Sequence, residues 1–336
     1  GNLSPFNLGT ATTDPTTFLG GDNLNFADLT NLRVNDDRFN AVALARYDLT
    51  DGIRFFGEAW YSKNKATNLA GQPVYNTAFF SQADPGAFDI NGNFIIPLSN
   101  PFLTQQAKAL IVQNLVAAGL PATNNDVFYL GRANTDLVTG VARLDQDMYR
   151  FVGGFRGDFQ IGERKFNWEV SANYGRTNSW SSQPSLVEPN LRRALNAGFD
   201  ASGNIVCLPF NPDPNDPASP PNTPQYNGTI SSTCAPLNLL GNGAPSQAAR
   251  DYVTTNARTQ SVTSQRDILA LLGGSLFKLP GGDLAFSIGY ENRREYSRFS
   301  PDAFYTQAYG RSIPILGLAG SYTTNEVFGE LRAPLV

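Results

Sequence analysis

The 336-residue sequence contains no histidine. Histidine is the commonest general base at neutral pH and the commonest metal ligand. A Ser-His-Asp or Cys-His catalytic site therefore cannot be built from this chain, and the remaining residues offer no recognisable set of base, nucleophile and orienting group. The sequence predicts that the chain is not an enzyme, and it indicates no catalytic residue, no cofactor and no metal site.

Charge is scarce as well. Charged residues make up 16% of the chain, and the net charge is −4. Nucleic-acid binding requires a basic patch, and the sequence shows none. We therefore expect no nucleic-acid partner. No apolar run reaches the roughly 18 residues of a transmembrane helix. Aromatic residues at 12%, together with 31 glycines, favour β-structure with long polar loops over a helical fold.

The chain has two cysteines, Cys207 and Cys234, on either side of a segment rich in Pro and Asn. Their spacing is neither that of a zinc site nor that of a redox pair. We predict a disulfide that tethers the base of a loop, which would place the protein in an oxidising compartment. Two free thiols are the alternative.

Side chains alternate between two sides in the stretch Ile53–Ser62, as in a β-strand. Arg54 and Glu58 fall on one side, and the other side is uncharged. The preceding residues 40–49 behave alike, and "TDG" at 50–52 has turn chemistry. The sequence therefore predicts a hairpin with one neutral and one charged face.

Two more hairpins follow the same rule. One runs from Tyr149 to Tyr174 with a turn in "QIGERK", and the other runs from Val262 to Arg294 with a turn at "LPGGD". A seventh strand is expected at 322–335. The links that follow the hairpins are long, at about 63–146, 177–259 and 297–321. Compact soluble domains rarely contain repeated loops of this length, whereas outer-membrane barrels alternate short turns with long loops.

A soluble β-sandwich would also alternate apolar and polar residues. The uncharged faces, however, carry aromatic residues near the strand ends, as in an aromatic girdle. A charge in a lipid-facing set would cost about 2–4 kcal/mol at mid-membrane, and none appears in the neutral sets of these strands. We therefore predict an all-β, transmembrane antiparallel β-barrel with long extracellular loops.

The two faces give two sets of candidate residues. The charged set should line the lumen, as cross-strand ion pairs or as contacts for a passing ligand: Arg46, Arg54, Glu58, Arg150, Arg156, Glu169, Glu291 and Arg293. The neutral set should face lipid: Tyr47, Phe55, Tyr61, Phe155, Trp168, Tyr174, Phe286 and Tyr290.

Five blocks of the sequence carry a family resemblance: "RFNAVALARYDLTDGIRFFGEAWYSK", "YRFVGGFRGDF…FNWEVSANYGRTNS", "CAPLNLLGNGAPSQAARDYV", "GGSLFKLPGGDLAFSIGYENRREYSRFSPD" and "SYTTNEVFGELRAPLV". In this order they cover most of the chain. The chain resembles the barrel of TonB-dependent outer-membrane receptors, of the Oar-like type known from sphingomonads.

The resemblance implies a large barrel of about 22 strands around a plug domain. It also implies energy-coupled uptake of a scarce ligand, such as a siderophore, vitamin, glycan or peptide, across the bacterial outer membrane through the TonB–ExbB–ExbD complex. Residues 1–336 are expected to be a fragment of the barrel domain, without the plug and the C-terminal strands. A passive porin or structural outer-membrane protein, or a soluble extracellular β-sandwich that binds a ligand, are the alternatives.

The first long loop contains "NPFLTQQAKALIVQNLVAAGLP", which predicts a short amphipathic helix. Asn100 has the chemistry of its N-cap, and Pro101 suits the first helical position. The helix would be either a lid that contacts a ligand or a packing element of its own loop.

Overall fold

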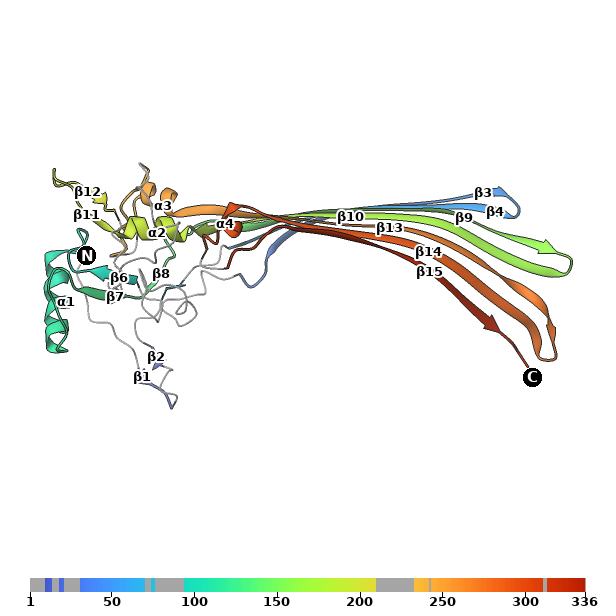
Figure 1. Ribbon diagram of the computed structural model, residues 1–336, viewed down its shortest axis with the longest axis horizontal. Coiled ribbons are helices and arrows are strands. Elements are labelled where there is room, and N and C mark those ends of the chain that lie inside the picture. Colours follow the sequence, from blue (N-terminus) through green and yellow to red (C-terminus); the bar gives the residue numbers. More distant parts are fainter. Residues whose placement is uncertain are drawn as a thin grey trace.

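The computed structural model describes residues 10–13, 18–20, 31–69, 74–75, 94–209, 233–241, 243–310 and 313–335. Its largest unit is one antiparallel sheet of seven strands, in the order β15-β14-β13-β10-β9-β4-β3 (Figure 1). The predicted all-β, antiparallel fold class is confirmed. The strands are β3 (Asn35–Thr50), β4 (Ile53–Leu69), β9 (Val141–Ile161), β10 (Arg164–Leu186), β13 (Thr254–Leu279), β14 (Gly282–Pro301) and β15 (Leu318–Arg332).

The three predicted hairpins are present with the expected turns. Tyr47 pairs with Phe55 in β3 and β4, and Phe155 pairs with Val170 in β9 and β10. The turn between β9 and β10 contains Gly162 at a φ of 62°, a conformation that glycine adopts without steric cost. Short turns therefore fix the register of each hairpin, and neighbouring hairpins pair into one continuous sheet.

The strands are longer than the sequence pattern indicated. They have between 15 residues in β15 and 26 in β13, whereas a tilted strand crosses a bilayer with about 9–11. They continue into stretches expected to be loop, so that the links between them are residues 70–140, 187–253 and 302–317. The extra length carries the sheet well beyond one bilayer thickness.

Small elements gather at the end of the sheet opposite the three short turns (Figure 1). They form two-stranded ribbons and short helices, and among the described residues no helix is long and apolar enough to cross a membrane. They are β1 (Thr10–Ala11) with β2 (Phe18–Leu19), β5 (Val74–Tyr75) with β8 (Arg132–Ala133), β6 (Phe94–Pro97) with β7 (Val127–Leu130), β11 (Ala197–Phe199) with β12 (Ile205–Cys207), and α1 (Gln105–Ala117), α2 (Glu188–Leu195), α3 (Gln247–Val253) and α4 (Ala303–Thr306).

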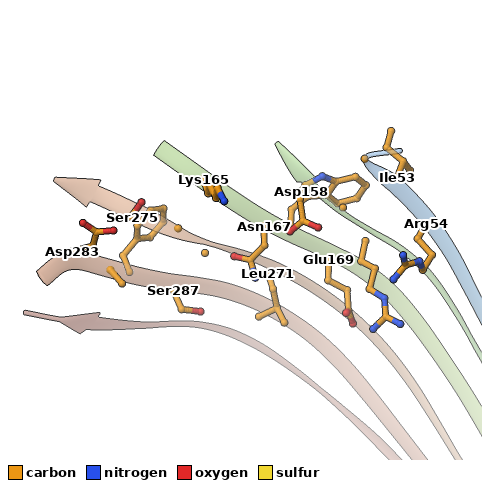
Figure 2. Close-up of a pocket in the computed structure, with 18 of the residues that line it drawn as sticks. Ile53, Arg54, Asp158, Lys165, Asn167, Glu169, Leu271, Ser275, Asp283 and Ser287 are labelled. Carbon is orange, nitrogen blue, oxygen red and sulfur yellow. The ribbon is translucent and has the colours of Figure 1, made fainter. Parts of the chain in front are cut away.

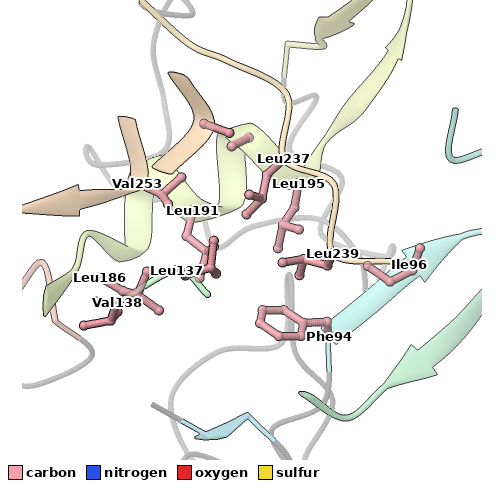
Figure 3. Packing of buried hydrophobic residues seen from close by; sticks show 12 residues of the cluster. Phe94, Ile96, Leu137, Val138, Leu186, Leu191, Leu195, Leu237, Leu239 and Val253 are labelled. Atoms are coloured by element: carbon pink, nitrogen blue, oxygen red, sulfur yellow. The ribbon is translucent and has the colours of Figure 1, made fainter. Parts of the chain in front are cut away.

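The main hydrophobic cluster lies among these loop elements (Figure 3). Phe94 comes from the first long loop, Leu191 and Leu237 from the second, and each is at most 2% exposed. Leu186 at the end of β10 and Val253 before β13 join the cluster to the sheet. The loops therefore pack as one body with its own core, which we call the loop cap.

The predicted helix exists as α1, but its N-cap differs from the expectation. The hydroxyl of Thr104 accepts a hydrogen bond from Ala107 N at 3.2 Å and caps the helix. The side chain of Asn100 is buried and accepts from Phe102 N at 2.9 Å in a preceding turn. Asn100 was the wrong cap because its side chain begins a separate turn ahead of the helix. Whether α1 acts as a lid stays a prediction.

Candidate functional site

The pairing register defines two faces of the sheet, because directly paired residues of neighbouring strands point to the same side. The side that contains Tyr47 and Phe155 is called the neutral face, and the opposite side is called the charged face. One row of paired residues crosses the neutral face through all seven strands and contains no charge: Tyr47, Phe55, Phe155, Val170, Ala270, Tyr290 and Val327.

The register divides the sixteen candidate residues between the two faces. Tyr47, Phe55, Tyr61, Phe155, Trp168, Tyr174, Phe286 and Tyr290 belong to the neutral face, and Arg46, Arg54, Glu58, Arg150, Arg156, Glu169, Glu291 and Arg293 belong to the charged face. Their predicted roles towards lipid and lumen remain proposals.

The neutral face is not covered by the described part of the chain. Tyr47 is 67% exposed and Phe155 is 45% exposed. The described residues contain no second large sheet, since every other sheet has two strands, and the loop cap lies beyond the end of the strands (Figure 1). A broad aromatic surface is therefore exposed. Its area exceeds that of the scattered single hydrophobic residues found on ordinary protein surfaces.

The charged face is hollowed near the short turns. A cavity of about 930 Å³ is lined by Arg54, Arg156 and Glu169 together with polar residues such as Asn167 and Ser287. Figure 2 shows Arg54 of β4 and Glu169 of β10 directed to the same side of the sheet. The cavity thus spans from the first hairpin to the third, and both signs of charge line it.

Aromatic and cationic groups stack inside this part of the charged face. The guanidinium of Arg156 lies 5.1 Å from the centroid of the Phe56 ring, a cation–π geometry. The ring lies against Gly154, where a Cβ atom would come within 2.8 Å of it. Arg156 is also the register partner of Glu169. Gly154 therefore lets an aromatic ring lie close to the sheet and hold an arginine.

Ion pairs hold the other charges of this face. Arg54 Nε lies 2.5 Å from Asp48 Oδ1. Arg293 lies 3.5 Å from Glu291, 3.6 Å from Glu295 and 3.9 Å from Glu326. Because these pairs are partly solvated, each contributes only about 0–1 kcal/mol to stability. Their clearer effect is to keep charges of both signs at fixed places on one surface.

Two of the remaining charged-face candidates have polar partners. Arg150 donates to Asn173 Oδ1 at 3.0 Å, and Glu58 accepts from Trp60 Nε1 at 3.2 Å. Arg46 and Glu58 line a smaller hollow of about 510 Å³. Sequence reasoning did not select Asp48, Phe56 or Glu295 for this site, although the same alternation extended along each strand places them there.

One expectation about the neutral face is wrong. Beyond the level of Tyr290, this face does carry charges: Arg266 and Arg294 are paired with each other in one row, and Arg176 lies one row further. The strands are longer than expected, so their loop-side parts extend past the uncharged zone. The uncharged zone, called the apolar band, runs along β9 from about Phe159 to Tyr149.

The height of the apolar band fits a bilayer. The ten steps along β9 from Phe159 to Tyr149 span roughly 33 Å of strand, which is about 25 Å along the normal for a strand tilted as in outer-membrane barrels. Aromatic residues mark both edges: Phe159 and Phe166 stack at the turn side with ring centroids 5.1 Å apart, and Tyr149 and Tyr174 lie 6.1 Å apart at the loop side.

A largely buried ion pair of the first long loop is joined to the second long loop by hydrogen bonds in the loop cap. Arg132 Nη2 lies 2.6 Å from Asp136 Oδ2 in the first loop, and the backbone N–H of Gly243 in the second donates to the same oxygen at 2.8 Å. Burial raises the pKa of Asp136, but these hydrogen bonds outweigh it, so the pKa lies below its ordinary value of 3.8. Arg132 Nε also donates to Leu239 O at 3.2 Å.

The predicted disulfide is present: Cys207 and Cys234 are bonded, with their Cα atoms 6.3 Å apart. Cys207 ends β12 and lies beside Ala197 of β11. Most of the Pro- and Asn-rich tract between the cysteines, residues 210–232, lies outside the described residues. The bond joins two points of the second long loop, within the loop cap.

Comparison with solved structures finds a structural likeness. The chain is similar to the siderophore receptor PiuA from Acinetobacter baumannii, with a TM-score of 0.36 and 14% sequence identity. The match covers 89% of this chain, which spans 30% of that receptor chain. No protein-family model matches the chain, and no curated protein matches it in sequence.

Proposed function

We propose that this chain is part of the barrel of an outer-membrane receptor of the TonB-dependent kind. In this proposal the neutral face meets lipid and the charged face lines the lumen. The natural protein takes up a scarce ligand, such as a siderophore, vitamin, glycan or peptide, with energy from the TonB–ExbB–ExbD complex.

The observation that carries the proposal is the open apolar band. Seven strands present uncharged rows about 25 Å high with aromatic residues at both edges, as the outer surface of a membrane barrel does. A β-sandwich would cover this face with a second sheet. An open sheet edge cannot satisfy its amides in lipid, so further strands are expected to pair with β3 and β15 and close the barrel.

The charged face supports a conduit rather than a reaction centre. Arg54, Arg156 and Glu169 provide charges of both signs beside small residues and a hollow. Such a surface can contact a polar ligand in passage or dock a plug.

Two measurements test the proposal in order. First, the natural protein should fractionate with the outer membrane and require detergent for extraction. If it is released by salt alone, the barrel assignment is lost. Second, deletion of its gene should abolish high-affinity uptake of one compound from a panel of ferric siderophores, cobalamin, oligosaccharides and peptides, and deletion of tonB should have the same effect.

The two membrane alternatives separate in a planar bilayer. A receptor closed by a plug should give no steady conductance when the natural protein is inserted, whereas a passive porin gives open channels. Stable channels together with uptake that persists without TonB would favour the porin.

A further inference from the structure

Two arginines lie directly opposite each other on the neutral face. Arg266 of β13 is the register partner of Arg294 of β14, and both side chains are exposed. Directly opposite side chains on an antiparallel pair are about 5 Å apart at Cβ, and like charges at such positions destabilise a sheet. Two further arginines extend the group on the same face: Arg176 in the next row on β10, and the exposed Arg298 on β14.

None of the four arginines has an acidic residue as a register partner. Asp147 of β9 lies on the same face in the row of Arg298, but its carboxylate lies 3.5 Å from Lys63 Nζ. The neutral-face positions of β10, β13, β14 and β15 include neither Asp nor Glu. The nearest polar partners are neutral: Arg266 Nη2 donates to Asn292 Oδ1 at 3.4 Å, and Arg176 Nε donates to Asn178 Oδ1 at 3.1 Å. Glu291 and Glu295 belong to the charged face, where they lie beside Arg293.

The position of the arginines relative to the apolar band suggests the nature of the missing anion. On β13 the neutral face is apolar through Leu272 and Ile268 and then reaches Arg266 at the next outward position. Tyr174 is paired with Arg266, and Tyr296 lies between Arg294 and Arg298 on the same face. Tyrosine and arginine directly above an apolar surface are typical of the headgroup level of a membrane. Since long loops are extracellular, this level belongs to the outer leaflet.

We propose that Arg176, Arg266, Arg294 and Arg298 form a binding surface for the phosphorylated headgroup of an outer-leaflet lipid. Arginine binds phosphate oxygens through two parallel hydrogen bonds, and a phosphate between Arg266 and Arg294 relieves their repulsion. The acyl chains of the same lipid cover the apolar rows below. This inference rests on the membrane position in the proposed function and not on the uptake of any ligand.

The test uses the natural protein in an uncharged detergent, with diphosphoryl lipid A as the probe and phosphatidylcholine as the comparison. Native mass spectrometry counts the lipid molecules that stay bound. The unmodified protein should retain lipid A in preference to phosphatidylcholine. The double variant Arg266→Gln/Arg294→Gln should bind lipid A on the order of tenfold more weakly, because each substitution removes a charge-assisted contact with phosphate.

The matched control removes two other exposed cations, Arg164→Gln and Lys278→Gln, which lie at the turn end of the sheet. It should retain lipid A as the unmodified protein does. Equal retention by both double variants overturns the inference, and so does equal retention of lipid A and phosphatidylcholine. If the protein is soluble without detergent, both this inference and the barrel assignment are wrong. If it requires detergent but shows no preference between the two lipids, only this inference is wrong.

Discussion

The sheet and the loop cap of this chain bury apolar groups in opposite ways. In the loop cap, Phe94 and Leu191 are fully enclosed by protein. In the sheet, the aromatic side chains of Tyr47 and Phe155 remain exposed. The same chain therefore packs apolar side chains against each other among its loops and leaves those of the neutral face uncovered by its described residues.

Polar groups also differ in burial between the loop cap and the sheet. The loop cap buries an ion pair between Arg192 and Glu188, whose side chains are 0% and 4% exposed. The sheet keeps its ion pairs on one face, and each is partly solvated, as for Arg54 and Asp48. In the loop cap, the ion pair between Arg192 and Glu188 is local, four residues apart in α2, whereas hydrogen bonds from Arg132 and to Asp136 join segments that are distant in sequence. In the sheet, the ion pairs lie between neighbouring strands or along one strand and add little beyond the backbone pairing.

The largest effect is expected from the core of the loop cap. Phe94→Ala removes a fully buried ring and should destabilise the cap by about 3–5 kcal/mol. Hydrogen exchange of the backbone amides in residues 94–138 of the natural protein measures this loss. Phe199→Ala, at a position 59% exposed, is the matched control and should change protection little. Equal effects of the two changes would contradict a separate core.

The disulfide is expected to come next. Replacing Cys207 and Cys234 by Ser opens a closure of 27 residues and should cost the loop cap about 3–4 kcal/mol under the chain-entropy model. Proteolysis of the second loop at graded temperature reports the change. Reductant should reproduce it in the unmodified protein and leave the double variant unaffected, and a response of the double variant would point to another cause.

A charge placed in the apolar band tests the sheet itself. Val170→Arg should destabilise the protein in lipid by about 2–4 kcal/mol, as for a cation on the lipid face near mid-membrane. Asn167→Arg, three residues earlier on the charged face of β10, should cost much less. Urea unfolding in phospholipid vesicles compares the two. If Asn167→Arg proves the more harmful, the faces are assigned the wrong way round.

The smallest effect concerns the junction of the two loops at Asp136. Asp136→Asn removes the charge that Arg132 and Gly243 N contact and should cost about 1–3 kcal/mol. Because the folded pKa of Asp136 is lowered, its contribution is present above the ordinary value of 3.8 and is lost as pH falls through the folded pKa.

Amide exchange of the loop cap at pH values on both sides of 3.8 distinguishes the variant from the unmodified protein. The unmodified junction should lose protection in acid more steeply than Asp136→Asn. Asp251→Asn, at an exposed position of α3, is the control. Identical acid profiles for all three proteins would rule out the Asp136 contact as a source of stability.

Much of the sheet could be predicted from the sequence because its rules are local. Alternation placed Tyr47 and Arg54 on opposite faces, and turn residues such as Gly162 fixed where each strand reverses. The strand ends could not be predicted in the same way. The apolar pattern stops at the edge of the band, while the backbone pairing of β10 continues to Leu186. For this reason the opposed pair of Arg266 and Arg294 was missed.

By itself, the sequence determined the alternation, the hairpin turns, the pairing of Cys207 with Cys234 and the absence of any histidine-based chemistry. Only the tertiary structure decided how Phe94, Leu191 and Leu237 meet in one core, and how Arg132 reaches Asp136 and a distant loop. The physical reason is the range of the interactions. Strand faces and tight turns are set by neighbours in sequence, whereas contacts between long loops depend on where the ends of the paired strands lie in space.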